Sequence, residues 1–275
     1  MSDNNRRLRE VAELYRFKDE TYNIDGPYHF KESKYWIIQY ARKRRFRGIK
    51  GSTVIVLSED GSIVRDWTIY HIISKAYLTP KISSKFIDVY REEDLKLNRI
   101  KSILESILNG EYEFNIDDLY AKAKEYEVRE LIQHLTAIKI NIEDILDNIK
   151  RLLDDRRNTH EIIREIYDVN ECEKLIKLFD EVLPDEVDAL RDIDMMISRQ
   201  GRLLLDLIDI IRELGMRRDV SKTLANSVNK YLHLLREFKR DLYKMIGLRN
   251  YMISVAKDRY ANIERYYHEF LNRVK

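Results

Sequence analysis

The sequence contains little cysteine, proline or glycine. Its single cysteine, Cys172, excludes an intramolecular disulfide and a cysteine-rich zinc site, and it is typical of a protein from a reducing compartment. The chain has no run of about 18 uncharged apolar residues, and residues 1–10 lack the apolar segment of a secretion signal. We therefore expect a cytoplasmic protein without a transmembrane segment.

Glycine is absent from residues 111–200, and the only proline of that interval is Pro184. Because glycine and proline weaken or end helices, their absence favours long helices. Residues 128–152 carry apolar side chains at alternating steps of three and four, the a and d positions of a heptad repeat. Two further heptad ladders, at 190–214 and 224–249, are each apolar at seven of eight positions. Short connections between these segments predict an elongated antiparallel three-helix coiled-coil-like bundle.

The N-terminal part of the chain differs from this bundle in charge and in pattern. Residues 1–91 carry 18 Lys and Arg against 11 Asp and Glu, and the remainder carries 32 against 37. Aromatic and β-branched residues predict strands, whereas apolar residues at helical spacing predict helices. The expected strands are 35–40, 53–57, 62–65 and 86–90, and the expected helices are 6–17, 67–78 and 92–108. The fold class is thus α+β: a basic head with a small β-meander and covering helices (1–91), a connecting helix and linker (92–116), and a long helical bundle (117–275).

A strongly basic segment lies between two of these expected strands. It places six cations within the ten residues 42–51. A β-hairpin of this composition could neutralise phosphates, and its aromatic residue could stack on a base or insert at a membrane surface. The alternative is a solvated loop, or a patch that pairs with the acidic helical region. The candidate anion-binding residues are Arg42, Lys43, Arg44, Arg45, Phe46, Arg47 and Lys50.

The heptad ladders are interrupted by polar residues, and the antiparallel register predicts that some of these meet. Reversals centred near residues 170 and 217 place residue 249 level with residues 185 and 155. The predicted polar layer consists of Arg156, Asp185, Glu186 and Arg249. Such a buried ionic layer often fixes register and partner choice rather than adding stability. A ligand site is the alternative interpretation.

The same register leaves residues 265–275 beyond the end of the bundle. The side chains of Tyr266, Tyr267, Phe270 and Leu271 would then lack a partner within the chain. Aromatic residues together with Arg are enriched at interface cores, so we expect a docking or dimerisation surface here. The alternative is that the last helix bends and these side chains pack internally.

Metal and catalytic motifs are poorly represented in the sequence. Several His and Glu residues share helical spacing, but their pattern matches neither di-iron bundles nor the His-Glu-x-x-His zinc motif. They are Glu130 with His134, Glu264 with His268, and His160 with Glu161 and Glu165. No glycine-rich phosphate loop, Gly-x-Ser-x-Gly elbow or Cys/His nucleophilic arrangement is present. We therefore expect no catalytic residue, no metal and no cofactor.

These patterns lead to three functional hypotheses. The leading one is a non-enzymatic scaffold or adaptor that binds a protein partner or associates with itself. The second is nucleic-acid binding through the basic segment 42–50. The third is a metal- or ligand-dependent helical-bundle enzyme.

Overall fold

The computed structural model describes residues 3–42, 52–125, 127–213 and 218–275. It confirms the α+β class, with a small antiparallel sheet followed by long helices. The chain divides into two compact units, each assembled from separate stretches of sequence. Unit 1 comprises residues 1–83, 159–184 and 251–275, and unit 2 comprises residues 84–158 and 185–250. This division differs from the contiguous domains expected from the sequence, because α5 (Arg129–Val169) and α8 (Arg218–Tyr260) each contribute to both units.

Unit 1 is built on a three-stranded antiparallel sheet in the order β1-β2-β3. Its strands are β1 (Glu20–Phe30), β2 (Ser33–Arg42) and β3 (Ser52–Ser58). The sequence predicted β2 and β3 but not β1, because Asp25-Gly26-Pro27 is a strong break signal. The structure instead carries the strand past that break with a register shift, and Gly26 has a φ of 134°. A Cβ there would lie 2.9 Å from the Tyr35 carbonyl oxygen, so glycine is required.

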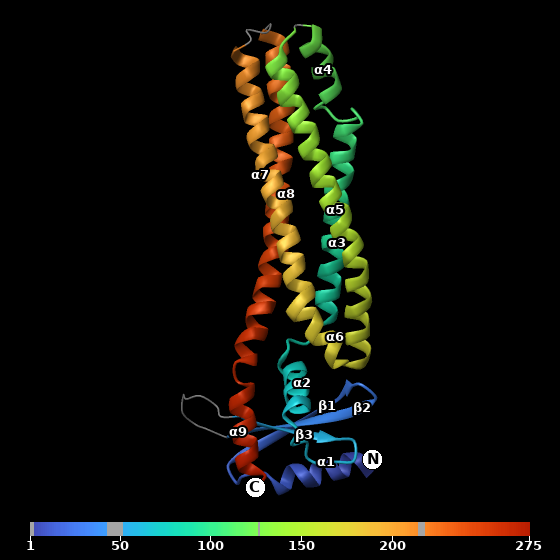
Figure 1. Cartoon of the computed structure of the whole chain (residues 1–275), viewed down its shortest axis with the longest axis vertical. Helices are drawn as coiled ribbons and strands as arrows, with labels where there is room; N and C mark the ends of the chain where they lie inside the picture. The colour runs from blue at the N-terminus through green and yellow to red at the C-terminus, as the bar shows by residue number, and fades with distance from the viewer. Residues whose placement is uncertain (1–2, 43–51, 126, 214–217) are drawn as a thin grey trace. The chain divides into compact units, whose positions relative to one another are not determined.

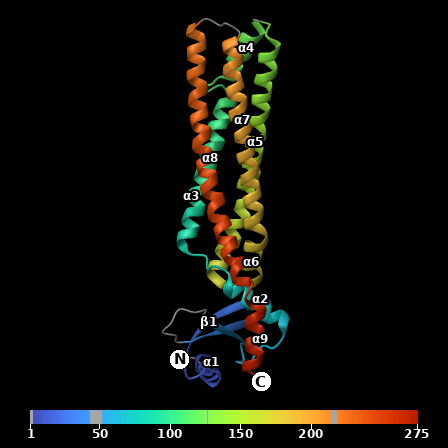
Figure 2. The ribbon, with the colours of Figure 1, turned by 90° about the vertical axis from the view of Figure 1, so that its left-hand side faces the viewer.

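The strand predicted at 62–65 is wrong, since that segment forms only an isolated bridge between Leu57 and Ile63. The sheet is covered by helices on both faces (Figures 1 and 2). Tyr77 of α2 (Trp67–Leu78) donates to Gln39 of β2 at 2.6 Å, whereas Tyr40 donates to the Ala12 carbonyl of α1 (Asp3–Leu14) at 2.9 Å. Consecutive residues of a strand point to opposite faces, so α1 and α2 cover opposite faces of the sheet.

A single side chain sets the start of α2. The Asp66 carboxylate accepts a hydrogen bond from the Ile69 amide at 2.9 Å and caps α2. Later in the chain, α6 (Cys172–Lys177) and a π-helical turn (Leu178–Val182) lead directly into α7 (Leu183–Glu213). Pro184 lies in the first turn of α7, directly after the π-helical turn, and the helix continues through it.

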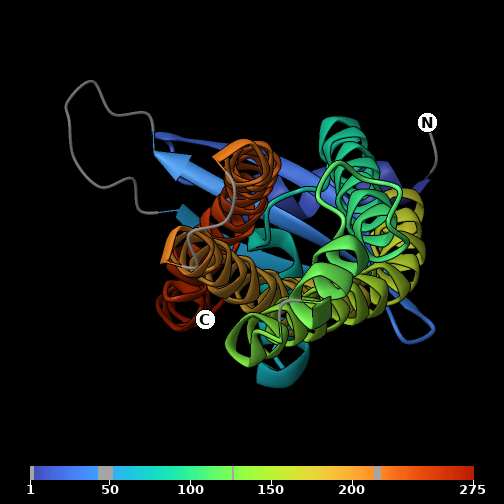
Figure 3. The same ribbon diagram turned by 90° about the horizontal axis from the view of Figure 1, so that it is seen from above.

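Unit 2 is a bundle in which α3 (Ser84–Leu108), α5, α7 and α8 lie side by side around a shared interior (Figures 1 and 3). α4 (Ile116–Glu125) precedes α5. The ladder of α5 faces the interior; its members Leu135, Ile138, Ile142, Ile145 and Ile149 have no exposed surface. α3 joins the three expected helices as a fourth. The strand predicted at 86–90 is wrong, because Phe86 and Tyr90 continue a helical seam that is buried along α3.

Candidate functional site

A group of buried charged side chains lies inside unit 2, one on each of its four long helices. Glu93 comes from α3, Arg156 from α5, Glu186 from α7 and Arg249 from α8. Their exposed fractions range only from 0% to 5%. Each lies on the inward-facing stripe of its helix, so helix packing brings all four together. With Tyr90 of α3, they are called the ionic layer below.

Arg249 is the most connected member of the ionic layer. Its Nε donates to Glu186 at 2.7 Å, and its two terminal nitrogens donate to the two oxygens of Glu93 at 2.6 and 3.1 Å. One of those nitrogens also donates to the Met245 carbonyl at 3.0 Å. Burial disfavours the charged guanidinium, but the two carboxylates outweigh burial and raise the pKa of Arg249. The residue is therefore a permanent buried cation.

Arg156 completes the ionic layer from the opposite helix. Its guanidinium lies 3.8 Å from the centre of the Tyr90 ring, donates to the Tyr90 carbonyl at 2.9 Å and donates to Glu93 at 3.2 Å. The Tyr90 hydroxyl in turn donates to Glu186. Burial and the nearby Glu186 charge raise the pKa of Tyr90, so this hydroxyl stays protonated and remains a donor. Asp94 forms a further ion pair with Arg156.

The structure brings together three of the four residues expected in the polar layer: Arg156, Glu186 and Arg249. Asp185 is exposed on α7, because the inward stripe of that helix passes through its neighbour instead. Sequence reasoning missed the whole contribution of α3. The signal was present, since Glu93 is the one charged position in the seam formed by Phe86, Tyr90, Glu93, Leu97 and Ile100.

The basic segment expected to bind anions falls largely outside the described residues. Arg42 ends β2, and Lys43, Arg44, Arg45, Phe46, Arg47 and Lys50 are not among the residues that the structure describes. The role suggested for them stays a prediction.

The C-terminal aromatic residues pack inside unit 1, so the expectation that they lack a partner is wrong for Tyr267 and Phe270. Phe270 has no exposed surface and stacks on Tyr70 of α2, with ring centres 5.3 Å apart. The Tyr267 ring lies 4.7 Å from that of Trp67. The expectation failed because α8 ends at Tyr260, and a separate helix, α9 (Ile263–Arg273), packs against the sheet. Tyr266 and Leu271 lie on the partly exposed side of α9.

The end of α9 is also held by a buried ion pair within unit 1. Arg273 donates to both oxygens of Glu20, each at 2.8 Å, and its guanidinium lies 4.5 Å from the Tyr40 ring centre. Both side chains are almost fully buried. A bidentate pair of this kind fixes the helix end in one orientation.

Two of the histidines that share helical spacing with glutamates contact neighbouring groups. His134 Nε2 lies 2.6 Å from the Leu203 carbonyl oxygen, and His268 lies 4.0 Å from Glu264 on the surface of α9. Within the described ranges, no group of three or more His, Cys, Asp or Glu is placed to hold a metal ion. Among the same residues, no helix combines the length and the apolar character needed to cross a membrane.

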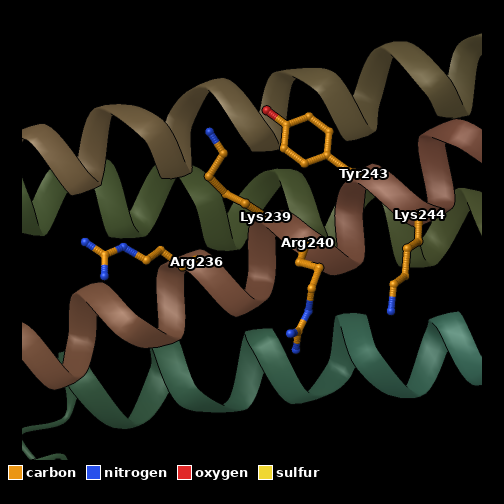
Figure 4. Close-up of a pocket in the computed structure, with 5 residues that line it drawn as sticks. All are labelled: Arg236, Lys239, Arg240, Tyr243 and Lys244. Carbon is orange, nitrogen blue, oxygen red and sulfur yellow. The ribbon is translucent and has the colours of Figure 1, made fainter.

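A basic surface on α8 was not expected from the sequence. Arg236, Lys239, Arg240, Tyr243 and Lys244 line an open pocket of about 490 Å³ (Figure 4). We call these five residues the α8 basic surface. Figure 4 shows Lys239 and Tyr243 on the side of α8 toward α7, and Arg240 and Lys244 on the side toward α3. The signal in the sequence was the spacing of three and four residues between them, which places them on one helical face.

Comparison of the chain with protein-family models, with curated proteins and with solved structures finds no match. The two candidate sites of unit 2 differ in their access to solvent. The ionic layer is closed, because its carboxylates and guanidiniums are buried and bound to one another. The α8 basic surface is open to any ligand that reaches the bundle.

Proposed function

We propose that the chain is a non-enzymatic scaffold or adaptor whose helical bundle presents a defined surface to a protein partner or to a second copy of itself. The observation that carries this proposal is the ionic layer. It links all four long helices of unit 2 through charged side chains that leave little freedom of register.

The energetics of buried charges support this interpretation. Removing two carboxylates and two guanidiniums from water costs several kcal/mol per ion, and even good geometry returns only part of that cost. A well-packed apolar layer at the same position would be equally or more stable. An ionic layer therefore contributes mainly to a unique helix alignment, which is what a binding surface that spans several helices requires.

The chemistry of the layer also favours a structural role over a catalytic one. Arg249 donates four hydrogen bonds, which go to Glu93, Glu186 and the Met245 carbonyl. The layer is buried, and its charges form ion pairs with one another and with Asp94, so it offers no open position to a substrate.

The proposal is tested by isolating the intact chain from its native source after mild chemical cross-linking, and by weighing the resulting species by light scattering. We expect one protein, or a second copy of the chain, in fixed stoichiometry. The purified partner should then bind the wild-type chain and bind Arg249→Met at least tenfold more weakly, because that variant loses the alignment of the four helices. Recovery of the chain as a monomer without a stoichiometric partner would contradict the proposal.

A second candidate function is nucleic-acid binding through the basic segment, supported by its six cations in ten residues. This function predicts an affinity that falls steeply with salt. Replacing Arg44, Arg45 and Arg47 together by Glu should abolish it. Unchanged oligonucleotide binding by that triple variant, measured by fluorescence anisotropy, would rule this segment out.

A further inference from the structure

We propose that the α8 basic surface binds the phosphodiester backbone of single-stranded nucleic acid, with Tyr243 as a platform on which one base stacks. This inference goes beyond the scaffold role and does not depend on it. It also concerns a site different from the basic segment 42–50.

The spacing of the cations suits a linear polyanion. Arg236, Arg240 and Lys244 follow one another at intervals of four residues, so they form a row along α8 with a rise of about 6 Å between successive members. All three are exposed. A row of evenly spaced cations matches a chain that carries one negative charge per repeating unit.

Nearby acidic groups leave part of this row uncompensated. Asp194 of α7 lies 3.6 Å from Lys239, and Glu237 lies 3.9 Å from Arg99 of α3. Among the residues that the structure describes, neither Arg236 nor Arg240 is held in an ion pair.

The charge of Lys244 also acts on Glu92 of α3. The hydrogen bond from Lys96 and, more weakly, the charge of Lys244 hold the pKa of Glu92 below its usual range. Glu92 is already engaged in an ion pair with Lys96 at 2.7 Å. Because Lys96 is the main partner of Glu92, this carboxylate balances the charge of Lys244 only in part.

Tyr243 gives the surface a feature that an ion-binding patch does not need. Its side chain is 55% exposed although it is a large aromatic residue, and the Lys239 ammonium lies 5.6 Å from its ring centre. Its hydroxyl donates to Asp194 at 3.4 Å, which orients the ring. An oriented, exposed aromatic ring among cations is the arrangement by which proteins bind single-stranded nucleic acid without reading its sequence.

An acidic protein segment or an anionic membrane fits the same surface less well. A docking helix requires an apolar stripe, and Tyr243 is the only large apolar ring among the five residues of the surface. A membrane requires a wider apolar and basic face than one helix provides here.

The test measures binding of a fluorescent 20-nucleotide oligothymidylate by anisotropy at several salt concentrations. The intact chain is compared with a variant that combines Arg236→Glu, Arg240→Glu and Lys244→Glu. Loss of three phosphate contacts should lower the slope of log affinity against log salt by about 2. The matched control reverses Lys150, Arg157 and Arg212, which are exposed on other parts of unit 2 and give the same change in net charge. We expect the control to keep the wild-type slope.

Tyr243 is tested separately. Tyr243→Ala should weaken binding about tenfold without changing the salt slope, because one stacked base is lost and no phosphate contact is lost. Tyr243→Phe keeps the ring but loses the hydrogen bond to Asp194, so it should bind more tightly than Tyr243→Ala and no more tightly than the wild type. Circular dichroism of each variant verifies that the helices are retained.

Several outcomes would overturn the inference. Equal salt slopes for the triple variant of the α8 basic surface and for its control would do so. Binding that depends only on Arg44, Arg45 and Arg47 would also do so, while leaving the second candidate function intact. Binding of anionic lipid vesicles or of an acidic peptide to the α8 basic surface, without binding of the oligonucleotide, would also overturn it, because the surface would then have a different ligand. None of these results bears on whether a protein partner binds the bundle.

Discussion

At the scale of single residues, the central feature is a guanidinium without solvent contact. Arg249 is 0% exposed, and its charge is stable there only because Glu93 and Glu186 lie within hydrogen-bond distance. Removing one member of such a network leaves the others buried and unbalanced, which costs far more than the intact network contributes. Substitution of Arg249 should therefore lower the stability of the protein by a measurable amount.

Arg249→Met should lower the free energy of unfolding by about 3–5 kcal/mol, because it leaves Glu93 and Glu186 with Arg156 as their remaining cation. The measurement is equilibrium denaturation followed by circular dichroism. Arg212→Met is the matched control, since Arg212 lies on α7 with a 70% exposed side chain. It should change stability by less than about 0.5 kcal/mol.

Charge balance can be separated from simple loss of packing by a second substitution. The double variant Arg249→Met with Glu186→Leu removes one charge of each sign, and we expect it to be more stable than the sum of the two single variants predicts. Strict additivity of the two effects would show that these side chains do not interact energetically.

Cys172 is the second residue with a distinct expected behaviour. It is buried in unit 1, and burial, with smaller contributions from Glu171 and Glu173, raises the pKa of its thiol to about 12. Because the thiolate is the reactive form, native protein at pH 8 should react with an aromatic disulfide reagent roughly a hundredfold or more slowly than unfolded protein. Equal rates in buffer and in guanidinium would contradict the burial of this residue.

The residue scale also shows what the sequence could and could not predict. Arg249 and Arg156 were recognisable because a charge interrupts an otherwise apolar seam. Glu93 obeys the same rule, but this region was interpreted as a strand at 86–90 followed by a helix at 92–108, so the apolar positions on both sides of residue 91 were not recognised as one helical seam. Glu186 could have been separated from Asp185, because a step of four back from Leu190 continues the ladder of α7 at residue 186 and leaves residue 185 outside it.

At the scale of elements, the heptad pattern predicted helix register closely. Residue 249 was expected level with residue 185, and Arg249 is bonded to Glu186. The first reversal places residue 141 level with residue 199, and Asn141 donates to Gln200 at 2.9 Å. Because the connections are short and the rise per residue is fixed, two antiparallel helices have little freedom to slide along each other. The residues that lie level with one another can therefore be predicted from the position of the reversal. Strands were harder, since β1 depends on a bulge at Gly26 that only its neighbours on β2 explain.

Two helical glycines provide a test at this scale. Gly201 in α7 and Gly247 in α8 lie within long helices, and a Cβ added at either would meet no atom within 4 Å. Replacing either by Ala should raise the free energy of unfolding by roughly 0.5–1 kcal/mol, because Ala loses less backbone entropy and meets no clash. Thermal unfolding measures the change.

Gly26→Ala is the matched opposite case. Gly26 has a φ of 134°, and its added Cβ would lie 2.9 Å from the Tyr35 carbonyl oxygen, so this substitution should destabilise the protein. If all three glycine variants changed stability in the same direction, conformational entropy and local space would not be the deciding factors.

At the scale of the whole molecule, the two units share helices but have separate cores. Each unit combines segments that are distant in sequence, such as residues 84–158 with residues 185–250. Periodicity in one segment cannot reveal which other segments share its core, so the sequence suggested contiguous domains. The sequence-based prediction also placed α3 outside the bundle, although α3 supplies Glu93 and Tyr90 to the ionic layer.

The separate cores lead to a prediction about hydrogen exchange in Arg249→Met. The ionic layer touches α3, α5, α7 and α8, so loss of one cation should speed amide exchange in all four helices of unit 2, including positions several turns from residue 249. Amides of β2 and β3 belong to the core of unit 1, and their exchange should stay near the wild-type rate. The measurement is native-state exchange read by mass spectrometry of peptides, with Arg212→Met as the control. Faster exchange confined to the α8 peptide around residue 249 would mean that the layer does not couple the four helices, and the case for a register-fixing role would fail with it.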